Sequence, residues 1–117
     1  MELGHVTVFT PAFEAEVAFY EGVLGLPVEH RSPHFVRFGT GACALAVHRA
    51  EAPAGTPAGD AIYLHLRVDD VDAAYVRLSR QDVRFEHPPR DMPWGQRVAA
   101  LRDPAGLHVE LYAPSAR

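Results

Sequence analysis

The sequence contains two copies of one pattern, and this internal repeat limits the architecture more than any other feature of the chain. Residues 4–48 and 64–112 each read as a strand, a helix and three further strands. The first copy opens with GHVTVF and the second with LHLRVD, so that His5 matches His65. Both openings alternate apolar and polar residues, as a half-buried strand does. The repeat therefore predicts two tandem modules of the same fold.

Each copy continues with a segment whose apolar residues recur at helical spacing. These residues are Phe13, Val17, Tyr20 and Leu24 in the first copy and Val71, Ala74, Tyr75 and Leu78 in the second. We expect one face of each helix to be buried against a sheet. Asp70 directly precedes the second helix and is a natural N-cap.

The segments after the helices predict the remaining strands. A strand ending in Glu-His comes first in both copies, LPVEH at 26–30 and VRFEH at 83–87, and two strands joined by a glycine-containing turn follow. In the second copy this turn is RDPAGL, where Pro104 fixes φ and Gly106 accepts positive φ. Residues 49–60 are rich in Pro, Ala and Gly without periodicity, which predicts a linker.

These elements predict a single α+β domain over residues 1–117, with module one at 1–50 and module two at 61–114. A length of 117 residues, with 48% hydrophobic and 22% charged residues, is typical of one soluble globular domain. No apolar stretch is long enough to cross a bilayer, and MELGHVTVFT lacks the pattern of a secretory signal. We therefore expect a cytoplasmic protein with no membrane partner.

Charge and cysteine content narrow the partners further. The net charge of −4 disfavours a nucleic-acid partner, because binding to a phosphate backbone normally needs a clustered basic face. The single cysteine, Cys43, excludes a thiolate metal cluster within one chain. Any metal ion must therefore be held by histidine and carboxylate side chains.

Alternation along the second copy divides its strand residues between two sheet faces. The apolar face, expected against the helix, has Leu64, Leu66, Val109 and Leu111. The opposite face has Tyr63, His65, Arg67, His108, Glu110 and Tyr112. A face that gathers polar and aromatic side chains in this way indicates a ligand-binding surface.

Two stretches, AFYEGVLGL at 18–26 and PWGQRVAALRDPAGLHVEL at 93–111, resemble signature segments of the vicinal-oxygen-chelate superfamily. Glyoxalases, extradiol dioxygenases and bleomycin-resistance proteins belong to this superfamily, and the resemblance covers nearly the whole chain. It implies two βαβββ modules that form a partly closed, eight-stranded antiparallel cup around a small-molecule ligand, with a helix on the outside of each module. A second subunit often completes the cup in short members, so the resemblance also implies a homodimer.

Metal-dependent members of the superfamily carry ligands on the first and last strands of each module. By position, the resemblance implies that His5, His65 and Glu110 bind a divalent metal ion and that Glu110 is also the catalytic residue. The counterpart of Glu110 in the first module is Ala46, and His48 is an alternative fourth ligand. Two imidazoles and a carboxylate can hold Fe, Mn, Ni, Co or Zn and leave positions open for a substrate that chelates through adjacent oxygens.

Further residues are candidates for contact with the substrate. Trp94 could stack on a planar ligand or pack as a loop residue. Arg67 and Arg97 could each bind a carboxylate or phosphonate, or form a surface ion pair. With the two tyrosines of the polar face, the substrate-binding candidates are Tyr63, Arg67, Trp94, Arg97 and Tyr112. The histidines expected at the surface or rim are His30, His34, His87 and His108.

Two functions from different classes remain open. The first is a metal-dependent lyase, isomerase, dioxygenase or transferase that acts on a small oxygen-rich molecule. The second is a metal-free protein that sequesters an antibiotic or metabolite, as bleomycin-resistance proteins do. The stretch from PWG to DPAG favours the second function, whereas the set His5, His65 and Glu110 favours the first. Because the sequestering proteins generally lack this ligand set, we favour the enzyme.

Overall fold

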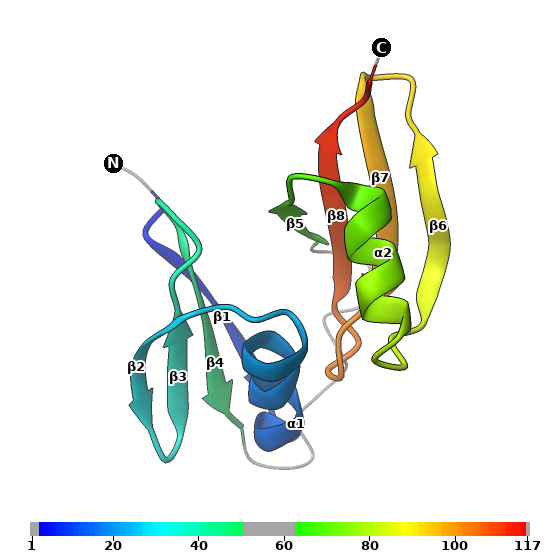
Figure 1. Cartoon of the computed structure of the whole chain (residues 1–117). Helices are drawn as coiled ribbons and strands as arrows, with labels where there is room; N and C mark the ends of the chain where they lie inside the picture. Colours follow the sequence, from blue (N-terminus) through cyan, green and yellow to red (C-terminus); the bar gives the residue numbers. More distant parts are fainter. Residues whose placement is uncertain (1–2, 51–62, 117) are drawn as a thin grey trace. The chain divides into compact units, whose positions relative to one another are not determined.

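The structure, a computed structural model, describes residues 3–50 and 63–116. It divides into two compact units, Met1–Pro57 and Ala58–Arg117 (Figure 1). These units correspond to the two predicted modules. Residues 51–60 of the predicted linker lie outside the described residues.

Both units contain their elements in the order βαβββ. The first unit has β1 (His5–Thr10), α1 (Phe13–Ala18), the π-helical turn η1 (Phe19–Val23), β2 (Val28–Ser32), β3 (Phe35–Phe38) and β4 (Ala44–Arg49). The second has β5 (Tyr63–Arg67), α2 (Val71–Ser79), β6 (Phe85–Asp91), β7 (Gln96–Arg102) and β8 (His108–Pro114). The two tandem modules predicted from the repeat are confirmed.

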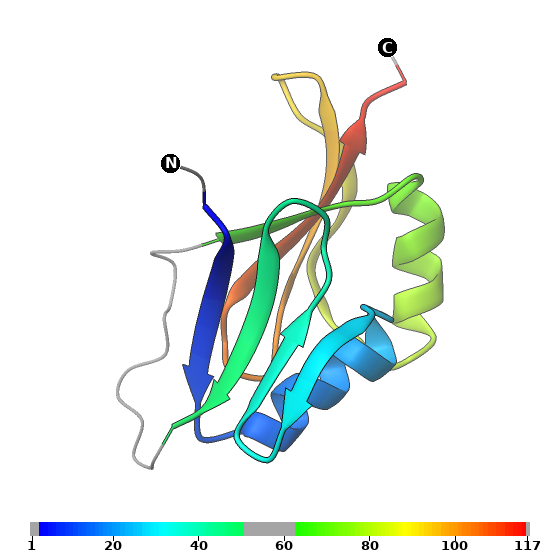
Figure 2. The same cartoon turned by 90° about the vertical axis from the view of Figure 1, so that its left-hand side faces the viewer.

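The strands form one four-stranded sheet in each unit, with the orders β1-β4-β3-β2 and β5-β8-β7-β6. The first and last strands of each unit pair in parallel, whereas the other pairs are antiparallel. In Figure 2 the blue arrow of β1 and the green arrow of β4 lie side by side and point the same way. The expected βαβββ modules are therefore present, and the sheets described as antiparallel are mixed, with one parallel pair in each. The helix and two intervening strands return the chain so that the last strand runs alongside the first in the same direction.

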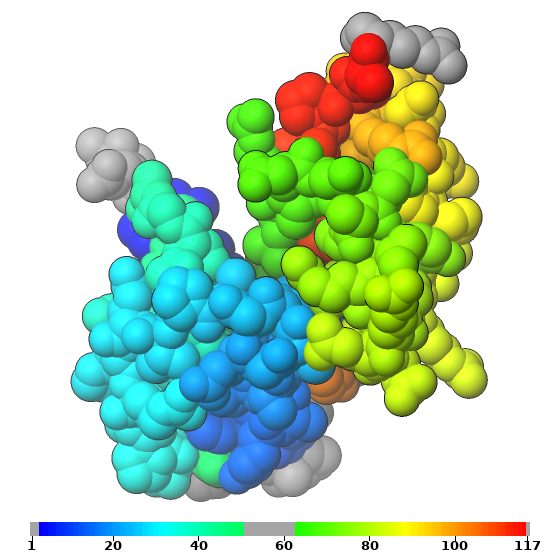
Figure 3. Space-filling model, in the orientation of Figure 1, coloured from blue at the N-terminus to red at the C-terminus, as the bar shows by residue number. Residues whose placement is uncertain are grey.

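The helices bury the faces that their spacing predicts. Phe13, Val17 and Tyr20 are buried in α1 and η1, and Leu24 is half-buried just beyond them. The buried residues of α2 are Val71, Ala74 and Leu78. This helix contacts β6, β7 and β8, and its green side chains cover the sheet face turned to the viewer in Figure 3. Within residues 3–50 and 63–116, no helix has the length and apolarity that a membrane crossing needs.

The turn between β7 and β8 has the geometry that its sequence predicts. Gly106 has a φ of 85°, and its N–H donates to the carbonyl oxygen of Asp103 at 2.9 Å. The Asp103 side chain also accepts the N–H of Leu107 at 2.8 Å. These contacts fix the start of β8 and therefore the register of the residues that follow it.

Asp70 caps α2 as predicted, since its side chain accepts the N–H of Ala73 at 3.1 Å. We expect Asp70→Ala to lower the free energy of unfolding by about 1 kcal/mol, because an N–H of the first helical turn loses its acceptor. Urea unfolding followed by circular dichroism would measure this change. Asp69→Ala is the matched control, and an equal loss in both variants would contradict the capping role.

Candidate functional site

The parallel pairing of β5 with β8 builds a polar and aromatic face in the second unit. Tyr63 pairs with His108, His65 with Glu110, and Arg67 with Tyr112. The residues between them on β8, Val109 and Leu111, are buried at 0% and 2% exposure. The predicted division of these two strands into an apolar and a polar face is thus what the register produces.

Glu110 lies between two imidazoles at the centre of this face. Its Oε2 is 3.3 Å from Nδ1 of His65, and its Oε1 is 3.4 Å from Nε2 of His108. The Glu110 side chain is 16% exposed, whereas that of His65 is 51% exposed. On the other side, β7 places Ala100 opposite Glu110, where a methyl group leaves the carboxylate uncrowded. The carboxylate therefore sits low in the face, and His65 reaches from it toward solvent.

His108 is buried, which corrects the expectation that it lies at the surface or rim. Its residue exposure is 9%, because the ring of Tyr63 stacks on it with centroids 3.8 Å apart and planes inclined by 20°. Nδ1 of His108 is 3.1 Å from Oε1 of Glu86. Among the described residues, neither ring nitrogen has a partner in hydrogen-bond geometry, although both lie within ion-pair distance of a carboxylate. A buried polar atom left in this condition costs about 1–3 kcal/mol.

Glu86 is a further member of this cluster, supplied by β6. Its Oε1 accepts from Nε of Arg102 at 3.0 Å, and Nη1 of Arg102 donates to the carbonyl oxygen of Gly106 at 3.1 Å. Glu86 and Arg102 are not among the site residues predicted from the sequence. Alternation places His108 on the same face as Glu110, but its burial depends on Tyr63 and Glu86 from other strands and leaves no signal within β8.

The first unit places its candidate ligands differently. His5 is exposed and pairs with Ala44, whereas Ala46, the counterpart of Glu110, is buried and pairs with Thr7. If Ala46 corresponds to Glu110, the register makes Thr7 the counterpart of His65, and His5 lies two residues earlier on the same strand. The first sheet thus lacks the His-Glu pair of the second at the equivalent position.

His48, the alternative fourth ligand, belongs to an aromatic row across the first sheet. Its ring centroid is 5.0 Å from that of Phe9 and 6.0 Å from that of Phe35. Its Nδ1 lies 2.8 Å from the carbonyl oxygen of Arg49. This nitrogen is therefore engaged with the backbone, and Nε2 is the ring atom left for another ligand.

The described residues contain no group of three His, Cys, Asp or Glu side chains arranged to hold a metal ion. The separation of the His65 and Glu110 side chains, however, fits that of two ligands of one metal ion. Two ligands bound at ~2.0–2.2 Å to a common ion lie roughly 3 Å apart, which is close to the 3.3 Å between Nδ1 and Oε2. His5 belongs to the other compact unit, so its convergence with this pair stays a prediction.

The two candidate arginines lie in different surroundings. Arg67 lines a shallow cavity of about 380 Å³ beside the start of α2, together with Asp69, Asp70 and Arg77. Arg97 instead faces the helix side of the sheet. Its guanidinium donates to both carboxylate oxygens of Asp72, at 2.7 and 2.9 Å, and to Asp91 at 3.2 Å. The pairing of Arg67 with Tyr112 puts Arg67 on the polar face, at the end of β5 that leads into α2, whereas Arg97 lies on the opposite face.

Three substrate-binding candidates remain, of which Tyr63 stacks on His108. Tyr112 is on the polar face, where its ring contacts His65 with centroids 6.4 Å apart. Trp94 lies in the turn between β6 and β7, is 66% exposed, and donates its Nε1–H to Gln96 at 3.2 Å. Tyr112 therefore shares the surroundings of Glu110, and the indole of Trp94 offers a separate open aromatic surface.

Comparison with known proteins identifies the class to which this fold and site belong. The sequence model of the Glyoxalase/Bleomycin resistance protein/Dioxygenase superfamily matches residues 2–111. The chain is a member of this superfamily, as the resemblance of its two signature stretches implied.

The similar proteins agree with this assignment. The chain is 28% identical to the uncharacterized protein YraH of Bacillus subtilis (strain 168), over 96% of this chain and 98% of YraH. It is 26% identical to a glyoxalase/bleomycin resistance protein/dioxygenase from Nocardioides, with a TM-score of 0.81 over 99% of this chain and 85% of that one. It is also 26% identical to a lactoylglutathione lyase from Agrobacterium tumefaciens, with a TM-score of 0.77 over 95% and 92%.

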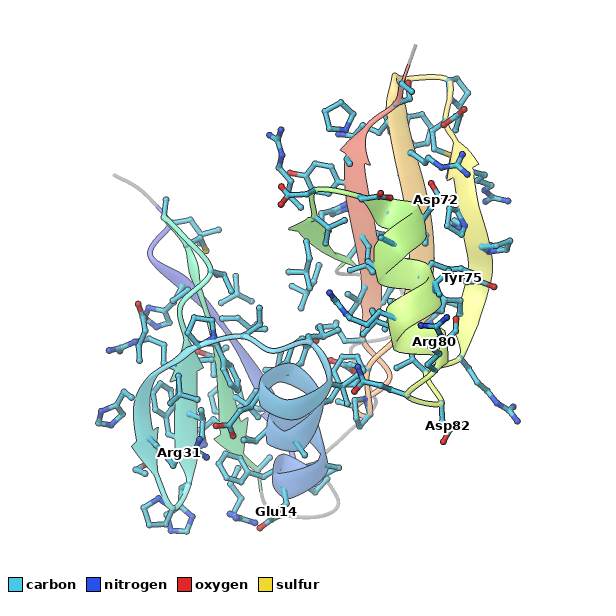
Figure 4. The ribbon with its side chains drawn as sticks, in the orientation of Figure 1. Glu14, Arg31, Asp72, Tyr75, Arg80 and Asp82 are labelled. Carbon is cyan, nitrogen blue, oxygen red and sulfur yellow. The ribbon has the colours of Figure 1, made fainter. Side chains whose placement is uncertain are left out.

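The hydrogen bond from Arg97 lowers the pKa of Asp72, which lies near the start of α2 (Figure 4). The folded state is therefore stabilised by this pair above the ordinary pKa of 3.8, and the stabilisation is lost as the pH falls through the lowered pKa. We expect Arg97→Gln to lower the melting temperature at neutral pH, and the difference from wild type to shrink in acid. Differential scanning calorimetry between pH 2 and 7 would test this.

Arg84→Gln, which changes an exposed arginine just before β6, is the control for the loss of one charge. Metal and ligand binding should be unchanged in both variants. A loss of ligand binding in Arg97→Gln without a change in melting temperature would show that Arg97 contacts the substrate.

Proposed function

We propose that this protein is a metal-dependent enzyme of the superfamily, active in the cytoplasm on a small oxygen-rich molecule. The observation that carries the proposal is the contact between Nδ1 of His65 and Oε2 of Glu110, 3.3 Å apart on adjacent strands. An imidazole and a carboxylate at this separation are ligand types that suit Fe, Mn, Ni, Co or Zn. His5 is the proposed third ligand, contributed by the first module or by a second subunit.

His65 and Glu110 would have different roles at this site. A divalent ion bound there would act as a Lewis acid toward substrate oxygens. His65 and Glu110 would hold the ion, and the substrate would bind through two adjacent oxygens. Glu110, the only carboxylate in the proposed set, would also accept a proton from the substrate and return it.

Four residues would hold the substrate in our proposal. Tyr63 and Tyr112 flank the His65 and Glu110 pair on the polar face, and Arg67 offers a guanidinium to a carboxylate or phosphonate of the substrate. Trp94 offers a planar surface for stacking. Arg97 is left out, because its donors are taken up by Asp72 and Asp91 on the other face of the sheet.

The second candidate function, metal-free sequestration of an antibiotic or metabolite, is favoured by a different observation. Glu110 already has an imidazole near each oxygen, so the cluster can balance its charge as an ion-pair network without a metal. The exposed rings of Tyr63 and Trp94, 42% and 66% exposed, could then bind a planar ligand. Metal content separates the two functions.

We expect protein purified without a metal-affinity tag to contain a divalent transition metal. In Glu110→Gln we expect the affinity for that metal to fall by at least about a hundredfold. The substitution removes the anionic ligand and keeps the size of the side chain. Elemental analysis and titration of metal-free protein with Zn²⁺ would measure both quantities. Unchanged affinity together with a lower melting temperature would show that Glu110 is structural, and would favour sequestration.

Glu29→Gln is the matched control for this experiment. Glu29 is on β2 of the first unit and pairs with Arg37 at 3.4 Å, so its loss changes the charge of the chain by the same amount outside the proposed site. Its metal affinity should equal that of wild type.

We also expect a homodimer, because each sheet has two outer strands that pair on one side only within the described residues. Exposed sheet edges favour association, and two-fold pairing is the commonest closed arrangement. Sedimentation equilibrium at micromolar concentration should give twice the mass of the chain. A single monomeric species across the concentration range would rule the dimer out.

A further inference from the structure

His108 lies beside the proposed ligand Glu110 rather than in the ligand set itself. It faces Glu110 from the side opposite His65, with Nε2 3.4 Å from Oε1, while His65 faces Oε2. Each carboxylate oxygen therefore has its own imidazole. The two imidazoles differ in access, since the side chain of His108 is 11% exposed and that of His65 is 51% exposed.

His108 is held in place on three sides. The ring of Tyr63 stacks on one face of it at 3.8 Å. Its Nδ1 is 3.1 Å from Oε1 of Glu86, and the same oxygen accepts from Arg102 at 3.0 Å. The backbone of His108 pairs with Tyr63 on β5 and with Arg102 on β7. The imidazole thus has a fixed plane and a fixed distance from Glu110.

The two buried ring nitrogens of His108 indicate that its fixed position serves to hold a neighbouring carboxylate. Within residues 3–50 and 63–116 neither nitrogen has a hydrogen-bond partner, although a carboxylate oxygen lies within ion-pair distance of each. A small rotation of the Glu110 side chain would bring Oε1 into hydrogen-bond geometry with Nε2. Such a bond would fix Oε1 and leave Oε2 as the oxygen presented beside His65.

We propose that His108 is a positioning residue, which holds Oε1 of Glu110 so that Oε2 and Nδ1 of His65 face the same metal ion. This inference rests on the proposed function, because it gives Glu110 a metal to bind. Partners of this kind orient a ligand before the metal arrives and raise its affinity. Glu86, Arg102 and Tyr63 would support His108 in turn.

The test compares two substitutions at one position. His108→Phe keeps a ring that can stack on Tyr63 and removes both nitrogens. His108→Gln replaces the ring with an amide whose nitrogen reaches about as far from the backbone as Nε2. We expect Zn²⁺ affinity to fall by roughly tenfold to a hundredfold in His108→Phe, and His108→Gln to recover part of this loss. Titration calorimetry on metal-free full-length protein would measure both, with circular dichroism to verify folding.

A purely structural role for His108 would give a different result. His108→Phe and His108→Gln would then differ in melting temperature and bind Zn²⁺ like wild type. The visible absorption spectrum of the Co²⁺ form adds a readout of ligand geometry, and we expect it to shift in His108→Phe and to return toward wild type in His108→Gln. His34→Phe, in the exposed turn between β2 and β3, is the control and should leave affinity and spectrum unchanged.

The outcomes separate this inference from the proposed function. If wild type binds Zn²⁺ and both His108 variants bind it equally well with an unchanged Co²⁺ spectrum, the positioning role is overturned and the proposed function stands. If wild type itself binds neither metal, the proposed function fails and the inference fails with it. If His108→Phe does not fold, weaker Zn²⁺ binding in folded His108→Gln supports the inference, and wild-type affinity in that variant overturns it.

Discussion

In the parallel pairing of β5 with β8, His65 lies directly opposite Glu110, and the chemistry of the second unit depends on this register. The side-chain period of a strand is two, so a shift of β8 by one residue would turn Glu110 toward α2 and bring Val109 or Leu111 onto the polar face. Burial of Val109 and Leu111 against the helix opposes such a shift. Burial of the apolar residues of β8 thus keeps Glu110 opposite His65.

The same register explains why an ionisable cluster is stable in this sheet. Glu86, His108 and Glu110 come from two strands, and each carboxylate faces an imidazole at 3.1 to 3.4 Å. Partly buried charges need a nearby opposite charge, because removal from water disfavours the charged form. Arg102 adds a permanent positive charge at Glu86. The cluster therefore places two carboxylates beside one guanidinium and two imidazoles.

The sequence predicts which face of each helix and strand is buried better than it predicts which strands pair and in which direction. Helical spacing identified Val71, Ala74 and Leu78, and alternation identified the polar residues of β5 and β8, because both follow from the local geometry of one element. The parallel direction of β8 beside β5 could not be found in this way. It depends on which edge of the sheet the last strand joins, and the apolar pattern is the same for either direction.

The surroundings of two of the residues considered for the site could not be predicted for the same reason. Alternation put His108 on the polar face, but its burial comes from the Tyr63 ring and from Glu86 on a strand more than twenty residues away in the chain. Arg97 alternates onto the helix side, and only the position of Asp72 on α2 shows that two carboxylate oxygens hold it there. Side chains from separate elements decide both cases, and a pattern read along one element does not contain them.

The two units use one fold with unequal chemistry. The pair at the equivalent position of the first sheet is Thr7 and Ala46, which offers one hydroxyl and no carboxylate. The carboxylate of the proposed ligand set therefore belongs to the second unit, and His5 lies two residues before Thr7 on its strand. The His65 and Glu110 pair is formed by two strands of one sheet, so its geometry is fixed within the second unit and does not depend on the first.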